Sequence, residues 1–229
     1  MSLYFLLLLA SVAAPIILSF DKRLQFYKQW KYVLPSIFIV AVVYIYFDVL
    51  LTESGIWGFN PRYLSGHYIF NLPIEECLFF FAIPYASIFL HYSIKEYFPK
   101  LKFSDNTTRI ILQLLIAFNL LILIFQFDKH YTMYISIKTI IVLLLALFDK
   151  SKTTNIFLIT FLVILIPFII VNGILTGSFI ADEIVWYNNA ENLGIRFFTI
   201  PVEDFAYAFS MILFNLLLIE NLKRIFEKK

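Results

Sequence analysis

The chain has 229 residues, of which 61% are hydrophobic and 15% charged, and its mean hydropathy is +0.84. Soluble domains average about 45–50% apolar and about 25% charged residues, so this composition predicts an integral membrane protein. The formal net charge of +2 is too small to indicate a nucleic-acid partner. The single cysteine, Cys77, excludes an intrachain disulfide framework, and three widely spaced histidines argue against a protein-built metal site.

Seven segments are long and apolar enough to cross a membrane, which takes about 20 residues for a hydrocarbon core of about 30 Å. The sequence therefore predicts an all-α, polytopic helix bundle. The predicted spans are Leu3–Phe20, Tyr32–Leu51, Pro73–Phe98, Arg109–Phe127, Tyr131–Phe148, Ile156–Thr176 and Phe198–Glu220. The first is interpreted as a helix and not a signal peptide, because no basic residue precedes it and no typical cleavage site follows it.

The basic residues predict the orientation. Most of the 18 Lys and Arg residues lie in or beside the loops after the first, third and fifth spans, and in the C-terminal tail. Positively charged loops stay on the cytoplasmic side, so we expect an external N-terminus and a cytoplasmic C-terminus. The predicted location is the cell membrane, crossed several times.

The chain contains a weak internal repeat. The sequence LPIEE at Leu72–Glu76 reappears as IPVED at Ile200–Asp204, an offset of 128, and DVLLT at Asp48–Thr52 matches NGILT at Asn172–Thr176, an offset of 124. We therefore expect three-helix repeats at residues 1–98 and 131–229, joined by a linker over residues 99–130 that holds the fourth helix.

Four crossings separate the first and fifth predicted helices, so both enter the membrane in the same direction. The repeats are then parallel, related by an axis along the membrane normal. We expect the third and seventh helices, which begin with the repeated motif, to face each other across this axis.

Each repeated motif places two acids after a proline at a helix start. Proline suits that position, and acids in the first turn gain about 0.3–1 kcal/mol from the helix dipole, so one reading is two capped helix ends. However, the motif occurs twice between apolar flanks, and acids inside a membrane are costly and by default functional. The residues concerned are Pro73, Glu75 and Glu76 in the first motif, and Pro201, Glu203 and Asp204 in the second.

These acids suggest acid–base chemistry. Neighbouring residues on a helix point about 100° apart, so one acid of each pair can face the bundle interior while its neighbour contacts another helix. Carboxyls gathered in a low dielectric cannot all ionise, which leaves a proton donor beside a base. Such a pair suits general acid–base catalysis on an apolar substrate.

Weaker candidates lie nearby. Asp48 is either a supporting member of the site or an interfacial residue, and its repeat counterpart is the neutral Asn172. Trp57 and Trp186 precede the two motif prolines by 16 and 15 residues; they fit an aromatic belt at the membrane interface better than substrate contacts.

Two arginines in the predicted outer loops, Arg62 and Arg196, have two readings. Either they pair with the motif carboxylates or they are solvated loop charges.

The two PxE(E/D) motifs, Pro73-Ile74-Glu75-Glu76 and Pro201-Val202-Glu203-Asp204, resemble those of the flavin-independent, heterodimeric-type lycopene cyclases in their fused form. The resemblance covers nearly the whole chain, with the fourth helix as the fusion linker. Asp204 departs from the glutamate that is also common at this position, which leaves open whether the two halves are equivalent.

The resemblance implies cyclisation of the ψ-ends of lycopene to β-ionone rings, through γ-carotene to β-carotene. The four motif acids would share the roles of acid, base and cation stabiliser. The reaction is an isomerisation, so no cofactor is expected, and the six glycines form no GxGxxG motif of a flavin-binding cyclase. The expected partners are the carotenoid, membrane lipid and other carotenoid-pathway enzymes.

Other functions remain open at this point. Related cyclases act on C50 carotenoids or make another ring isomer. An intramembrane prenyltransferase would need an Asp-rich motif for Mg²⁺ and diphosphate, and none is present. A proton-coupled transporter could use paired carboxylates, and an inert scaffold could need none. A retinal-binding rhodopsin is excluded, because Phe198–Glu220 contains no lysine for a Schiff base.

Overall fold

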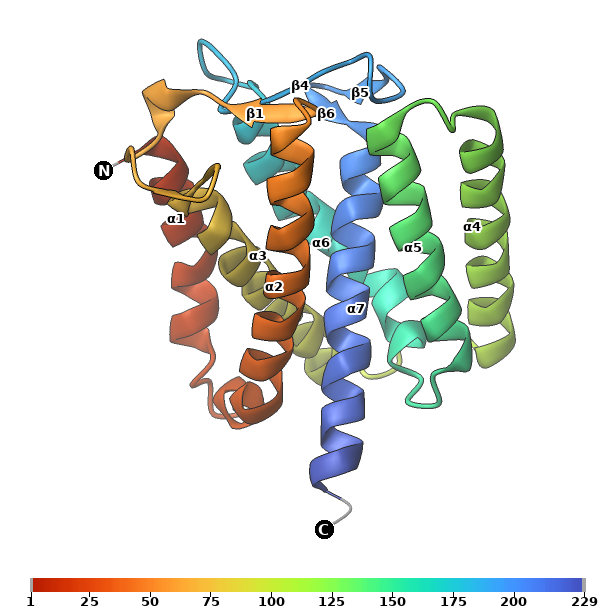
Figure 1. Cartoon of the computed structure of the whole chain (residues 1–229). Coiled ribbons are helices and arrows are strands. Elements are labelled where there is room, and N and C mark those ends of the chain that lie inside the picture. Colours follow the sequence, from red (N-terminus) through yellow and green to blue (C-terminus); the bar gives the residue numbers. More distant parts are fainter. Residues whose placement is uncertain (1, 228–229) are drawn as a thin grey trace.

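The computed structural model describes residues 2–227 and is a bundle of seven α-helices with short strands at one end (Figure 1). The helices are α1 (Leu3–Leu18), α2 (Trp30–Glu53), α3 (Ile74–Tyr97), α4 (Asp105–Phe125), α5 (His130–Phe148), α6 (Thr153–Leu175) and α7 (Val202–Phe226). The strands are β1 (Trp57–Phe59), β2 (Tyr68–Ile69), β3 (Leu72–Pro73), β4 (Val185–Tyr187), β5 (Arg196–Phe197) and β6 (Ile200–Pro201). The predicted all-α membrane bundle is confirmed.

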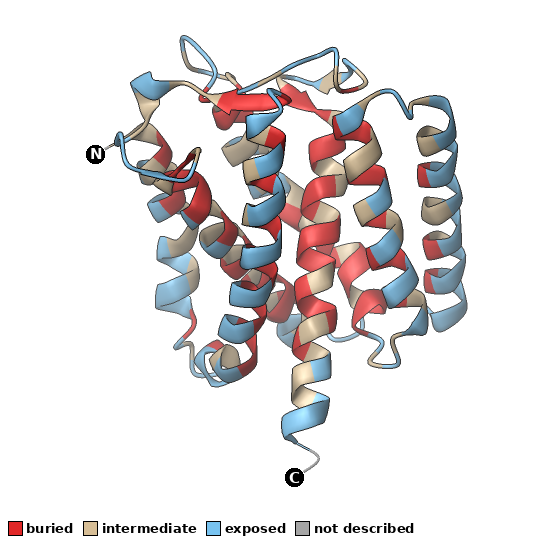
Figure 2. Cartoon of the chain, viewed as in Figure 1, coloured by how far each residue is buried: buried red, intermediate tan, exposed pale blue. Residues whose placement is uncertain are grey.

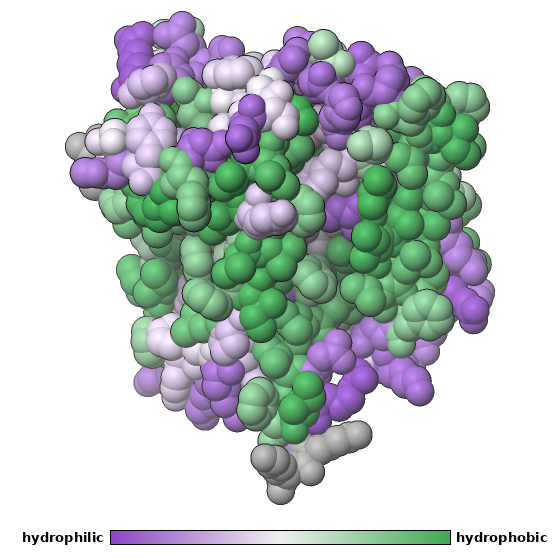
Figure 3. Space-filling model, viewed as in Figure 1, coloured by the Kyte–Doolittle hydropathy of each residue, from purple (hydrophilic) through white to green (hydrophobic). Residues whose placement is uncertain are grey.

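Six helices, α2 to α7, are long and apolar enough to cross a membrane. The prediction gave seven spans, but α1 has only 16 residues and is about 24 Å long at 1.5 Å per residue. It ends at Leu18, where the chain turns toward α2. On the face seen in Figure 3, apolar side chains predominate between two polar ends, as expected for a protein that sits in a bilayer.

Two helix starts lie four residues from the predicted spans, the largest differences among the starts, because hydropathy does not detect local hydrogen bonding. The seventh helix begins at Val202 and not at Phe198, since the chain before it forms the β5–β6 hairpin. The fourth begins at Asp105, four residues before the predicted span, because the Ser104 hydroxyl caps it by accepting a hydrogen bond from the Thr107 N–H at 3.1 Å.

The two halves of the bundle have matching architecture. α1 packs on α3 as α5 packs on α7, and the β2–β3 hairpin before α3 matches the β5–β6 hairpin before α7. The turn of each hairpin holds a phenylalanine with positive φ, Phe70 at 56° and Phe198 at 54°. These two residues are 128 positions apart, the same offset as the two motifs. The repetition seen in the sequence therefore extends to backbone geometry.

The two halves interlock. α2 packs on α7, α6 packs on α3, and α3 also contacts α7, as predicted. β1 from the first half pairs antiparallel with β4 from the second, with Trp57 opposite Tyr187. The most buried part of the bundle lies around α3 and α7, whereas α4 packs mainly on α5 at the edge (Figure 2). The centre thus belongs to both repeats, and the strand pair covers it at the end where the motif helices begin.

Candidate active site

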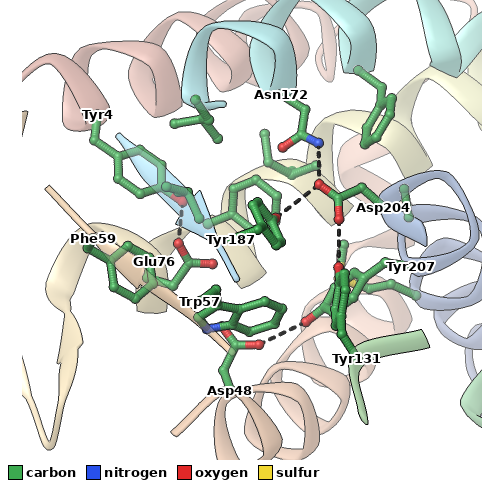
Figure 4. Close-up of a pocket in the computed structure, with 17 residues that line it drawn as sticks. Tyr4, Asp48, Trp57, Phe59, Glu76, Tyr131, Asn172, Tyr187, Asp204 and Tyr207 are labelled. Atoms are coloured by element: carbon green, nitrogen blue, oxygen red, sulfur yellow. Dashed lines mark hydrogen bonds between the residues drawn. The ribbon is translucent and has the colours of Figure 1, made fainter. Parts of the chain in front are cut away.

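A cavity of about 60 Å³ lies under the β1–β4 strand pair, enclosed by elements of both repeats. Three carboxyl groups enter it, one each from α2, α3 and α7, together with tyrosines and aliphatic side chains (Figure 4). Its polar lining residues are Tyr4, Asp48, Glu76, Tyr131, Asn172, Tyr187, Asp204 and Tyr207. The site therefore combines acids with an otherwise apolar wall.

Glu76 comes from the first turn of α3. Its side chain is buried, and the Tyr4 hydroxyl on α1 donates a 2.6 Å hydrogen bond to its Oε2. The β2–β3 hairpin fixes where this helix begins, because the N–H of Ile74 donates to the carbonyl of His67 at 2.9 Å. Local folding of the motif thus delivers one carboxyl to the cavity.

Asp204 occupies the equivalent position in α7 and is more heavily hydrogen-bonded. The Tyr131 hydroxyl donates to its Oδ1 at 2.6 Å, while the Asn172 amide and the Tyr187 hydroxyl donate to its Oδ2 at 2.9 and 3.0 Å. Hydrogen bonds from three donors stabilise the ionised form of a carboxyl group.

Asp48, on α2, is the third acid of the cavity and is 1% exposed. The Tyr207 hydroxyl donates to its Oδ1 at 3.1 Å, and its Oδ2 has no partner among the described residues. Of the two readings of Asp48, the structure supports membership of the site and not an interfacial position. Asn172, its repeat counterpart, lies in the same cavity as a donor to Asp204.

The first acid of each motif points elsewhere. Oε1 of Glu75 accepts hydrogen bonds from the Ser2 hydroxyl at 2.6 Å and the Ser65 N–H at 2.7 Å. In the second repeat, Oε1 of Glu203 accepts hydrogen bonds from the Thr132 hydroxyl at 2.7 Å and from the Leu193 N–H at 2.8 Å. The structure thus brings Glu76 and Asp204 into one cavity and places Glu75 and Glu203 against loops.

The motif prolines stand one residue before their helices. Pro73 and Pro201 are the last residues of β3 and β6 and have extended backbone, with ψ of 145° and 138°. A proline there donates no N–H, and its ring fixes φ at a value that suits the strand-to-helix turn. They therefore set the direction in which the acids of the first turn point.

The two tryptophans lie in different environments. Trp57 is buried, lines the cavity and makes edge contacts with Tyr131 and Tyr187 at ring-centroid distances of 5.3 and 5.9 Å. Trp186 is 40% exposed and covers Gly58, because successive strand residues face opposite ways. The interpretation as interface-belt residues fits Trp186 but is wrong for Trp57, because Trp57 is buried against the cavity.

The two loop arginines do not pair with the motif acids. Arg62 forms an exposed ion pair with Asp182 at 3.0 Å. Arg196 donates to the Thr199 carbonyl and to the Asn189 side chain at 2.7 and 2.8 Å. Of the two readings, these residues are loop charges: Arg62 joins the loop before α3 to the loop after α6, and Arg196 braces its own loop.

Sequence reasoning missed the tyrosines that surround the acids. Tyr4 and Tyr131 lie near the starts of α1 and α5, 127 residues apart, so extending the repeat alignment to the first helix of each unit would have found them. Burial, together with the nearby Asp204 carboxylate, raises the pKa of Tyr187 well above its ordinary value. Its phenol therefore keeps its proton and remains a donor to Asp204.

Within residues 2–227, no three His, Cys, Asp or Glu side chains are placed to hold a metal ion. Comparison with known proteins gives one family. The family model described as lycopene cyclase matches residues 1–94 and 128–222, and the whole of α4 lies in the gap between the two matched stretches. No curated protein and no solved structure matches the chain.

Proposed function

This chain belongs to the lycopene cyclase family, and on that basis we propose that it is a lycopene β-cyclase that closes the ψ-ends of lycopene into β-ionone rings, giving γ-carotene and β-carotene. Family membership makes it an isomerase-type enzyme of carotenoid biosynthesis. The observation that supports the proposal best is the cavity itself, where the second acid of each motif meets the other in an apolar enclosure.

Glu76 is assigned the role of general acid. It accepts a single hydrogen bond from the described residues, so its ionised form has little stabilisation in a buried site and its protonated form is available. Proton transfer from the Glu76 carboxyl to the terminal double bond of a ψ-end gives a tertiary carbocation. The electrons of a nearby double bond then form the ring carbon–carbon bond and move the positive charge into the ring.

Asp204 is assigned the role of general base. With three hydrogen-bond donors it is held as a carboxylate, which stabilises the ring cation and then removes a proton to form the ring double bond. One proton enters and one leaves, so the product is an isomer of the substrate. Transfer of the proton from Asp204 back to Glu76 restores the starting state.

Asp48 and the aromatic rings stabilise the cation. The carboxyl of Asp48 lies on a third side of the cavity, where its unpartnered Oδ2 can face the positive charge, and the faces of electron-rich rings such as Trp57 attract cations. Glu75 and Glu203 act indirectly in this scheme, by fixing the loops that close the cavity.

Expression in a lycopene-accumulating host, followed by pigment chromatography, tests the proposal. Cyclised carotenoid is expected with the wild type and should be lost in Glu76→Gln and Asp204→Asn, while Glu53→Gln, an exposed acid on α2, serves as the control. The ring isomer is read from the absorption spectrum and retention of the product. Unchanged lycopene despite confirmed membrane expression would remove the cyclase assignment. Proton flux in liposomes would then favour a transporter.

The orientation and unit boundaries belong to the same proposal. An external N-terminus puts the cavity on the outer side of the membrane, and residues 1–98 and 131–229 form the two catalytic repeats around a linker at residues 99–130. Single cysteines at Phe70 and Lys152, in loops at opposite ends of the bundle, test this in a Cys77→Ser background. An impermeant thiol reagent should label only the first in intact cells.

A further inference from the structure

A groove of about 430 Å³ lies mainly between α1, α3 and α6 and borders the carboxylate cavity. On α3 its lining extends from Phe79 to Leu90, a distance of about 16 Å along a helix. The residues that line both spaces are Phe79, Ile83, Phe168, Asn172 and Ala208. The groove is therefore elongated and lies directly beside the site, with five side chains that line both spaces.

The chemistry of this groove suits a hydrocarbon. Its walls are largely aliphatic and aromatic, and among its polar side chains Ser11 donates to the Leu7 carbonyl and Asn172 donates to Asp204. Along α1 the small side chains of Ala10 and Ala14 leave it open toward the exposed surface of the bundle. A linear apolar chain lying here would meet few polar groups, of which the Ser87 hydroxyl is one.

A second groove is larger but is not connected to the acids. It has a volume of about 820 Å³, lies between α1, α2 and α3, and shares none of its described lining residues with the cavity. The groove between α1, α3 and α6 is therefore distinguished by the walls that it shares with the carboxylate cavity, and not by its volume.

In the second repeat the equivalent opening is filled. The repeat offsets of 124 to 128 relate Leu7, Ser11, Phe79 and Phe168, all of which line the open groove, to Tyr134, Lys138, Tyr207 and Tyr44. The Nζ atom of Lys138 lies over the rings of these three tyrosines, at 3.3 Å from the centroid of Tyr207, 4.4 Å from that of Tyr44 and 5.0 Å from that of Tyr134.

Lys138 is held there by the rings. Its Nζ atom is buried and has no hydrogen-bond partner among the described residues. The amino group is enclosed by three ring faces, so bulky side chains fill the opening. An unpaired polar group is also a poor neighbour for a hydrocarbon chain, and the opening is closed to one both by bulk and by chemistry.

We propose that the groove between α1, α3 and α6 binds the linear polyene chain of the substrate while one end group lies among Glu76, Asp204 and Asp48, and that Lys138 and its three tyrosines close the equivalent opening in the second repeat. This inference rests on the proposed function, because only a reaction at a chain end requires the rest of the chain to leave the cavity in one direction.

The test compares Ala10→Phe, which fills the groove, with Ala13→Phe, the same change on an exposed part of α1 that lines neither groove. Turnover of lycopene is measured in membranes. Ala10→Phe should lose about 100-fold, because the chain end no longer reaches the acids. Ala13→Phe should stay within about twofold of the wild type, as expected for a surface substitution.

Binding is measured separately in lipid nanodiscs with Glu76→Gln, which lacks the proposed acid. Lycopene is achiral and acquires circular dichroism in its visible band only when a protein holds it. The signal should persist in Glu76→Gln/Ala13→Phe and disappear in Glu76→Gln/Ala10→Phe. Equal signals and equal turnover in the two alanine variants would overturn the channel. Failure of the wild type to cyclise lycopene would overturn the proposed function, and the dichroism would still decide where a polyene binds.

Discussion

Tyr4 and Glu76 form a buried hydrogen bond of 2.6 Å that joins the start of α1 to the start of α3. Its repeat counterpart joins Tyr131 to Asp204 over the same distance. Glu76 accepts no other hydrogen bond from the described residues, whereas Asp204 accepts two more. The same architectural bond therefore supports two carboxyls with different proton affinities, which is what an acid and a base in one site require.

The two tyrosines should differ in importance. Tyr4→Phe removes the one described donor to Glu76, which stabilises the carboxylate left when Glu76 gives up its proton. Leaving that buried carboxylate unpaired costs about 1–3 kcal/mol, so turnover should fall about 10-fold or more. Tyr131→Phe leaves Asp204 two donors and should have the smaller effect. Initial rates of cyclisation at equal protein in membranes decide the order, and a larger loss in Tyr131→Phe would contradict the assigned roles.

Glutamine substitutions should separate the two acids of the first motif. Glu76→Gln removes the proposed acid and should lower the rate by about 10²–10⁴-fold with the folded bundle intact. Glu75→Gln should keep measurable turnover but lower the thermal stability, because Glu75 binds the backbone of the loop before α3. Pigment analysis and melting in detergent are both needed. Wild-type activity in both variants would show that neither residue is the acid.

The loop before α7 should depend on Thr132. Thr132→Val removes the hydroxyl that donates to Glu203 and leaves a buried carboxyl short of a donor, at a cost of about 1–3 kcal/mol. The melting temperature should fall and proteolysis between α6 and α7 should rise. Thr139→Val, at a buried hydroxyl of the same helix that has no hydrogen-bond partner among the described residues, is the matched control and should change little. Unchanged melting of Thr132→Val would exclude the anchoring role.

The two tryptophans should respond differently to truncation. Trp57→Ala removes a buried ring at the roof of the cavity, and such changes cost about 3–5 kcal/mol. Trp186→Ala removes a ring that is 40% exposed and should cost less, with turnover largely retained. Urea or thermal unfolding of purified protein, compared with cyclisation rates, tests the contrast. Equal losses would mean that the strand pair is one cooperative unit.

A chain divided between α4 and α5 should reassemble. Residues 1–127 and 128–229, expressed together, should co-purify through a tag on either piece and restore cyclisation, because α2 packs on α7, α3 on α6 and β1 on β4. Either piece alone lacks half of the carboxyl site and should be inactive. Activity of a single piece would contradict a site shared by both repeats.

The sequence was sufficient for the helices, the repeat and the family because these depend on long apolar segments and on a motif that occurs twice. It could not place the strands, which have two or three residues and no period to detect. For that reason the prediction began the seventh helix at Phe198, whereas α7 begins at Val202: the apolar segment starts with the turn and second strand of the β5–β6 hairpin.

The candidate site was less accessible to sequence reasoning. Adjacent acids point about 100° apart, so the sequence alone did not reveal that Glu76 and not Glu75 faces the cavity. Trp57 and Trp186 belong to neighbouring residue pairs of the β1–β4 ladder, so their side chains face opposite ways. Trp57 faces the cavity and Trp186 faces the surface. Lys138 was passed over because a single lysine in an apolar helix has no sequence pattern; only packing shows the three rings around it. The assignment of catalytic roles and of the unit boundaries stays a prediction.

The Lys138 cluster has a consequence for the order of events along the pathway. A channel with one entrance admits one end of a symmetrical molecule, so a product with two rings requires two visits. Between the two binding events the one-ring carotenoid returns to the bilayer, reverses its orientation and competes with lycopene for the same entrance. Pigment composition would then follow supply: abundant lycopene favours accumulation of γ-carotene, and scarcity lets the second ring form.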